Sequence, residues 1–453
     1  MSHEIIALAV LVIVFLIATL RGVNMGALAL VAAFVVGLTV YGIEVDEILD
    51  GFPAGLFVIL VGVTYLFALA KNNGTVDWIV HGAVRAVGGR VALVPWAMFL
   101  VCAIVTAIGA VSPAAVAIVA PVAMGFALRY EIHPVMMGMM VVQGATAGSF
   151  SPIGIFGSIT NGVVESNDIP GNPLLLAVSA FLASTVIAAA AYFAFGGREL
   201  MSRGRDTAAL AALDETAGGA AREGLRADQG WGEPHSATEA QRTVTNPALP
   251  EGDTHRLNAQ RTLTLLGLVA LIIGALGFDL DVGFVALTIA VLLTLAFPAS
   301  AKGAVDKISW GTVLLVGGIV TYVTLLQNQG VVDWLGEGVA SVGAPLVAAL
   351  LICVIGAVVS AFASTTGIIG ALIPLAVPFL LTDQVSAVGL IAALAISSSV
   401  VDCSPFSTNG ALVVANAEAD TREMVFRKLM VWGMSIVVIA PLVTWLLFVV
   451  PTA

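Results

Sequence analysis

The stretch GSFSPIGIFGSITNG, residues 148–162, is informative about the fold, because it interrupts an apolar region with residues that disfavour a regular helix. It has four glycines, one proline, several hydroxyl side chains and an asparagine, and it has no charge. Proline removes a backbone donor and blocks the preceding turn, and glycine permits an open backbone. The stretch VDCSPFSTNG, residues 401–410, has the same character, so the chain contains two such breaks.

The composition around these breaks is that of a membrane protein. The 453 residues are 59% hydrophobic and 10% charged, whereas soluble domains are about 25% charged. Apolar segments of about 18 residues or more recur along the chain, which predicts an all-α polytopic membrane protein in the lipid bilayer. Residues 5–20 lack a basic leader and a cleavage site, so we expect a retained span. The net charge of −11 argues against a nucleic-acid partner.

The chain contains an internal repeat, in which three segments of the first half match three segments of the second. TYLFALAKNNGTVDW (64–78) matches TYVTLLQNQGVVDW (321–334), SPAAVAIVAPVA (112–123) matches TTGIIGALIPLA (365–376), and SITNGVV (158–164) matches FSTNGALVV (406–414). Three matches in the same order predict a first repeat at 1–197, a linker at 198–261 and a second repeat at 262–453.

Each repeat is expected to cross the membrane five times, so the second repeat is inverted. If the N-terminus lies outside, all 18 lysines and arginines fall on the inner side, and the outer loops carry only acids. That distribution follows the positive-inside rule. It predicts an inner-membrane protein with both termini outside and the linker in the cytoplasm.

Two long apolar segments, 91–128 and 345–381, turn at uncharged stretches: GAVSPAA (109–115) and FASTTGII (362–369). Such turns predict re-entrant hairpins whose tips end inside protein, although two ordinary spans with a tight loop would return to the same side as well. Each hairpin precedes an interrupted helix, at 135–164 and 385–416. Inverted repeats with interrupted helices are typical of secondary transporters.

The breaks offer polar groups at membrane depth. Freed carbonyls and hydroxyls suit a hard cation such as sodium, and freed N–H groups suit an anion; the alternative is a packing kink satisfied by neighbouring hydroxyls. Asp402 is the one acid in these segments. A carboxylate at this depth indicates a cation ligand or a proton carrier, unless it lies near the mouth of the span or caps a half-helix.

These residues resemble the ion-transporter superfamily, in particular the divalent-anion/sodium symporters and, most closely, the MatC-type dicarboxylate carriers. Relatives have two inverted repeats, each with a hairpin tip that reads Ser-Asn-Thr and a broken helix with a Pro/Thr/Asn motif. The resemblance implies that the tips bind a small dicarboxylate, such as malonate or succinate, and that each tip and break hold sodium. It also implies a homodimer and an elevator motion.

Carried over residue by residue, the resemblance assigns two groups of positions. The substrate-binding candidates at the tips are Ser112, Pro113, Ser364, Thr365 and Thr366. The cation-binding candidates at the breaks are Ser151, Gly154, Asn161, Asp402, Ser404, Thr408 and Asn409. Pro113 and Ala114 replace the amide and hydroxyl of the usual tip, and Asp402 has no counterpart in the usual motif.

The leading interpretation is therefore a cation-coupled symporter of a small dicarboxylate, with sodium or a proton as coupling ion and no other cofactor. A sodium/proton antiporter or an oxyanion exporter that uses Asp402 is the alternative on the same fold. An intramembrane enzyme is disfavoured, because the sequence has no H-E-x-x-H motif and no paired intramembrane acids. A channel is also possible, but two opposed hairpins suit a transporter that works by alternating access better.

Overall fold

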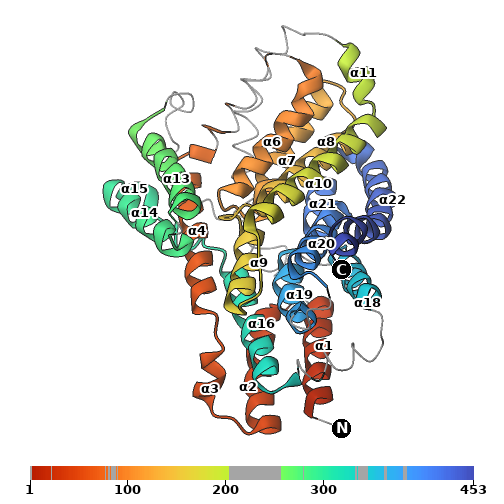
Figure 1. Ribbon diagram of the computed structural model, residues 1–453. Helices are drawn as coiled ribbons and strands as arrows, with labels where there is room; N and C mark the ends of the chain where they lie inside the picture. Colours follow the sequence, from red (N-terminus) through yellow and green to blue (C-terminus); the bar gives the residue numbers. More distant parts are fainter. Residues whose placement is uncertain are drawn as a thin grey trace, which may run out of the picture.

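The computed structural model describes residues 3–203 and 257–452, apart from residues 22, 77, 80–81, 83–87, 89, 279, 332–333, 335–344, 362–364 and 381–384. Within these ranges the fold consists of helices and loops and contains no β-sheet (Figure 1). The all-α class predicted from composition is thus confirmed.

The described part of the first half is almost entirely helical. Its helices are α1 (His3–Arg21), α2 (Met25–Val36) with η1 (Gly37–Tyr41), α3 (Val45–Asp50), α4 (Ala54–Asn72), η2 (Val91–Leu93), α6 (Val94–Ala107), α7 (Ser112–Arg129), α8 (Pro134–Ser149), α9 (Ile155–Ser166), α10 (Pro173–Ala194) and α11 (Gly197–Ser202). Most of α11 lies inside the predicted linker, so helical structure continues past the predicted end of the first repeat at residue 197.

The second half repeats the order. Its helices are α13 (Ala259–Gly277), α14 (Val282–Ala296), α15 (Pro298–Ala301), α16 (Trp310–Asn328), α18 (Pro345–Ser360), α19 (Thr365–Leu380), α20 (Ala387–Ser399), η4 (Val400–Cys403), α21 (Thr408–Ala415), α22 (Ala419–Thr444), η5 (Trp445–Val449) and η6 (Val450–Thr452). Most of residues 75–89 and 330–342 and most of the predicted linker lie outside the described residues.

Helix contacts gather into two bodies, each with helices from both halves, and the bodies touch where α19 packs on α16 and α9 packs on α4. In the first body α4 packs on α14 and α2 packs on α16. In the second body α8 packs on α6, α7 and α10, and α20 makes the equivalent contacts with α18, α19 and α22. Equivalent pairs from the two halves are what an internal repeat predicts. In Figure 1, α6, α7, α8 and α10 adjoin α20–α22, and α13–α15 lie apart from them.

The segment 91–128 forms a hairpin whose tip is buried. Its first arm is the apolar helix Val91–Ala107, made of η2 and α6, which is about 25 Å long and near the lower limit for a membrane span. At the tip, Ala110 and Ser112 are fully buried. Gly109 has φ +108°, and a side chain there would collide with Val63 of α4. The buried turn agrees with the predicted re-entrant hairpin, because the loop between two ordinary spans would reach water.

The hairpins also cross between the halves. The second arm of the first hairpin, α7, contacts the second broken helix at α21, and α19 of the second hairpin contacts the first broken helix at α9. Six helices or helix pairs in the described ranges are long and apolar enough to span a bilayer, by length and composition. The chain is thus a multi-pass membrane protein in which each break faces the hairpin of the opposite half.

Candidate substrate and cation site

The first break is a sharp turn between α8 and α9. The N–H of Gly154 donates to the carbonyl of Ser151 at 2.9 Å, and the N–H of Ser158 donates to the carbonyl of Gly154 at 2.8 Å. The hydroxyl of Ser151 donates to the carbonyl of Ala107 at 2.7 Å, which ties the break to the end of α6. The break therefore lies beside the tip of its own hairpin, as the sequence predicts.

The second break repeats this backbone geometry. The N–H of Ser407 donates to the carbonyl of Ser404 at 3.0 Å, and the N–H of Ala411 donates to the carbonyl of Ser407 at 2.9 Å. Here the cap is polar, because the Ser407 hydroxyl donates to the carbonyls of Asp402 and Ser404 and accepts from the N–H of Gly410. The Ser407 side chain thus caps the start of α21, whereas Gly154, at the equivalent position before α9, has no side chain to do so.

These contacts fix how the two breaks correspond. Ser151 pairs with Ser404, and Gly157 pairs with Gly410: a Cβ on Gly157 would lie 2.0 Å from the carbonyl oxygen of Ser151, and one on Gly410 would lie 1.9 Å from that of Ser404. The structural counterpart of Asn409 is therefore Phe156.

The sequence match of SITNGVV with FSTNGALVV, which pairs Asn161 with Asn409, is consequently out of register. Asn161 lies in the following turn of α9, where it lines a pocket with Asn172 and Ile391. The motif Thr-Asn-Gly occurs in both halves, but the structure does not bring its first copy to the same position in the break.

Asn409 joins the first hairpin to the second break. Its amide nitrogen donates to the hydroxyl of Ser112 at 2.6 Å and to Oδ2 of Asp402 at 2.7 Å. An ionised carboxylate accepts only, so it holds the amide nitrogen toward itself. The hydroxyl of Thr365, at the start of α19, also faces the Asp402 carboxylate and lies 3.1 Å from the hydroxyl of Ser360. The second hairpin therefore faces the acid through Thr365, and the first is linked to it through Asn409.

The cluster is closed to solvent. Ser112 and Asn409 are fully buried, and Asp402 and Thr365 are each 2% exposed. Oδ1 of Asp402 and Oδ1 of Asn409 have no hydrogen-bond partner among the described residues. Buried acceptors are almost always satisfied, and a buried charge is costly unless it is paired. The two free oxygens are therefore suited to a cation or, at Asp402, a proton.

The remaining candidates lie around this cluster. The hydroxyl of Ser404 accepts from the N–H of Phe406 at 3.3 Å, and the half-buried Thr408 begins α21. Pro113 follows Ser112 in the first turn of α7. Ser364 lies outside the described residues, and Thr366 is described only as part of α19.

Gln143 of α8 is a polar residue that the sequence analysis did not single out. It is fully buried, and its amide nitrogen donates to the carbonyl of Val400 at 3.0 Å, two residues before Asp402. Its amide oxygen has no partner among the described residues. A lone glutamine in the apolar run MMVVQGAT was the available signal. Within the described residues, the structure has no group of three His, Cys, Asp or Glu that could hold a multivalent metal.

Two family descriptions match the chain, one in each half. Residues 1–149 match the family described as the dicarboxylate carrier protein MatC N-terminus, and residues 280–452 match the citrate transporter family CitMHS. Together the two matches support a relationship to the ion-transporter superfamily, with a MatC-like first half. The superfamily resemblance seen in the sequence is thus confirmed, and both families are transporters rather than enzymes.

The fold is similar to that of a solved transporter. The YdaH transporter of Alcanivorax borkumensis, whose structure is described as having an unusual topology, superposes with a TM-score of 0.58 over 89% of each chain at 14% sequence identity. A likeness at this identity concerns the fold alone. No curated protein matches the chain significantly in sequence.

Proposed function

We propose that the protein is a secondary transporter that carries a small dicarboxylate, such as malonate or succinate, together with a cation, most simply sodium. The family matches in both halves support the carboxylate class. The observation that carries the coupling is the position of Asn409, which bonds a hairpin tip through Ser112 and a buried acid through Asp402. The groups proposed to bind the substrate and the cation are therefore joined by one amide side chain.

The coupling follows from charge. With Asp402 ionised and no cation bound, a dianion at the tips meets a buried negative charge. A cation held by the free oxygens of Asp402 and Asn409 cancels that charge, so each ligand strengthens the binding of the other. Ser112 and Thr365, with their neighbours Pro113, Ser364 and Thr366, are the proposed substrate positions. Ser404 and Thr408 lie beside the proposed cation and add oxygens.

An elevator motion is supported by the way each body is held together. Within the first body, a side chain on Gly318 would lie 1.9 Å from the backbone carbonyl of Gly26. Within the second, one on Gly148 would lie 1.9 Å from that of Ala103. Such close backbone contact locks helices to each other. We propose that the second body moves against the first as a unit, within a homodimer.

Uptake into proteoliposomes tests the proposed function. Radiolabelled malonate, succinate and citrate are each offered with an inward sodium gradient, with an inward proton gradient, and with neither. We expect malonate or succinate to accumulate with a cation gradient only. Equal uptake under all three conditions contradicts the coupling. Sodium-driven proton movement without dicarboxylate uptake would instead support the antiporter.

Labelling of single cysteines tests the proposed cytoplasmic linker. The native cysteines Cys102, Cys353 and Cys403 are buried, so a membrane-impermeant thiol reagent reports an introduced cysteine. We expect Ser236→Cys in the linker to react only after the cells are opened, because positive loops stay inside. Ser2→Cys, at the proposed outer N-terminus, is the control that reacts in intact cells. Reaction of Ser236→Cys in intact cells would reverse the topology.

A further inference from the structure

The two breaks share a backbone and differ in chemistry. In the register set by the Ser151–Gly157 and Ser404–Gly410 contacts, Ser149 takes the place of Asp402 and Phe156 takes the place of Asn409. The second break therefore presents a carboxylate and an amide where the first presents a hydroxyl and an aromatic ring.

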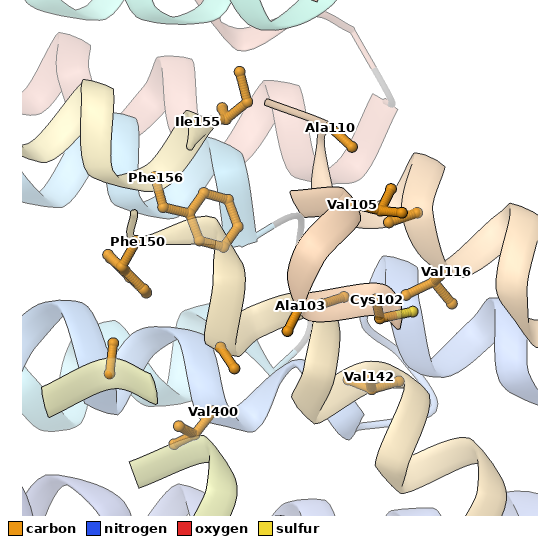
Figure 2. Packing of buried hydrophobic residues seen from close by; sticks show 14 of the residues in the cluster. Cys102, Ala103, Val105, Ala110, Val116, Val142, Phe150, Ile155, Phe156 and Val400 are labelled. Atoms are coloured by element: carbon orange, nitrogen blue, oxygen red, sulfur yellow. The ribbon is translucent and has the colours of Figure 1, made fainter. Parts of the chain in front are cut away.

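The first break is closed by its own side chains. The hydroxyl of Ser149 donates to the carbonyl of Ala145 at 2.6 Å, within its own helix. The ring of Phe156 is fully buried and lies against Phe150, with centroids 5.4 Å apart. Figure 2 shows Phe150, Phe156 and Ile155 at the break, in the same apolar cluster as Ala110 and Val105. Apolar packing fills the position that the second break leaves to polar groups.

The free polar atoms show the same contrast. The second break holds two buried acceptor oxygens without a partner among the described residues, on Asp402 and Asn409. Near the first break, in α9, the hydroxyl of Thr160 has no partner among the described residues, but it carries no charge. Asp402 is also the single buried acid in the described residues. Only the second break has both the charge and the free oxygens that attract a cation.

We propose that the protein has a single coupling-cation site, at Asp402 and Asn409, and that the first break is an apolar counterpart that holds no ion. This inference rests on the proposed cation coupling and sets its stoichiometry: one cation for each substrate molecule. The candidates Ser151, Gly154 and Asn161 then shape the first break without binding sodium.

Ion binding by the purified protein is the first measurement. Equilibrium dialysis of the full chain in detergent against radioactive sodium should give one bound ion per chain. Asp402→Asn should abolish that binding, and Asn161→Ala should leave it unchanged. Two ions per chain, or loss of an ion in Asn161→Ala, would overturn the proposal.

Transport energetics give the second measurement. With the membrane potential clamped at zero, the logarithm of the substrate accumulation ratio is plotted against that of the sodium gradient. The slope should be one, and a slope of two would refute the single site. If the coupling ion is a proton, the pH gradient replaces the sodium gradient with the same expected slope. One bound ion without uptake of any dicarboxylate would leave the single site intact and refute the proposed substrate.

A gain of function checks the register. Phe156→Asn with Ser149→Asp reproduces at the first break the pair found at the second. If the breaks correspond as the structure indicates, this variant should bind a second ion per chain. A variant that folds, as judged by size-exclusion chromatography, and still binds one ion would show that the two breaks are not equivalent.

Discussion

Replacing Asp402 by asparagine is expected to abolish accumulation of substrate against its gradient while leaving exchange of substrate across the membrane. Asparagine keeps the shape of the side chain and removes the charge that the cation neutralises. The site then no longer needs the cation before it accepts a dianion, so binding of the two ligands is uncoupled. Coupling energies of about 1–3 kcal/mol correspond to a fall in cation-stimulated uptake of about 5-fold to 150-fold.

The measurement is a comparison of two assays on the same proteoliposomes. Net uptake driven by a sodium or pH gradient should fall, and counterflow between equal substrate pools should persist. Asp281→Asn is the matched control, because Asp281 is an exposed acid that caps α14 through the N–H of Phe284 and asparagine caps equally well. Gradient-driven uptake by Asp402→Asn at the wild-type level would contradict this role of the carboxylate.

Gly410→Ala is expected to cause a large loss of stability. The added methyl group would lie 1.9 Å from the carbonyl oxygen of Ser404 and 3.0 Å from that of Cys403. The Ser404 carbonyl cannot withdraw easily, because it accepts hydrogen bonds from the N–H and the hydroxyl of Ser407. We expect a cost at the upper end of the overpacking range, about 3 kcal/mol, since the second break would have to rearrange.

The melting temperature of the detergent-purified protein measures this cost. Gly157→Ala should behave like Gly410→Ala, because its methyl group would meet the Ser151 carbonyl in the same way. Gly55→Ala in α4 is the control: no heavy atom lies within 4 Å of the added methyl group, and alanine favours the helix by about 1 kcal/mol. An unchanged melting temperature for Gly410→Ala would mean that the break is more pliable than its hydrogen bonds indicate.

The architecture of the chain could be predicted from local features of the sequence. Proline, glycine and hydroxyl side chains in an apolar run are local signals, so Pro152 and Pro405 marked both breaks correctly. The uncharged turn at 109–115 marked the first buried tip for the same reason, since a turn that reaches water in this chain carries a charge. Asp402 could be singled out because an acid is rare in such a segment.

Which residues meet at the site depends on how the helices pack, so it could not be predicted from local sequence. The register of the two breaks depends on backbone contacts such as that of Gly410 with Ser404, and the recurrence of Thr-Asn-Gly in α9 misled the sequence match. The bond between Asn409 and Ser112 joins residues 297 positions apart. Contacts over such separations are set by how helices pack, because a local motif carries no information about which distant hairpin will face it.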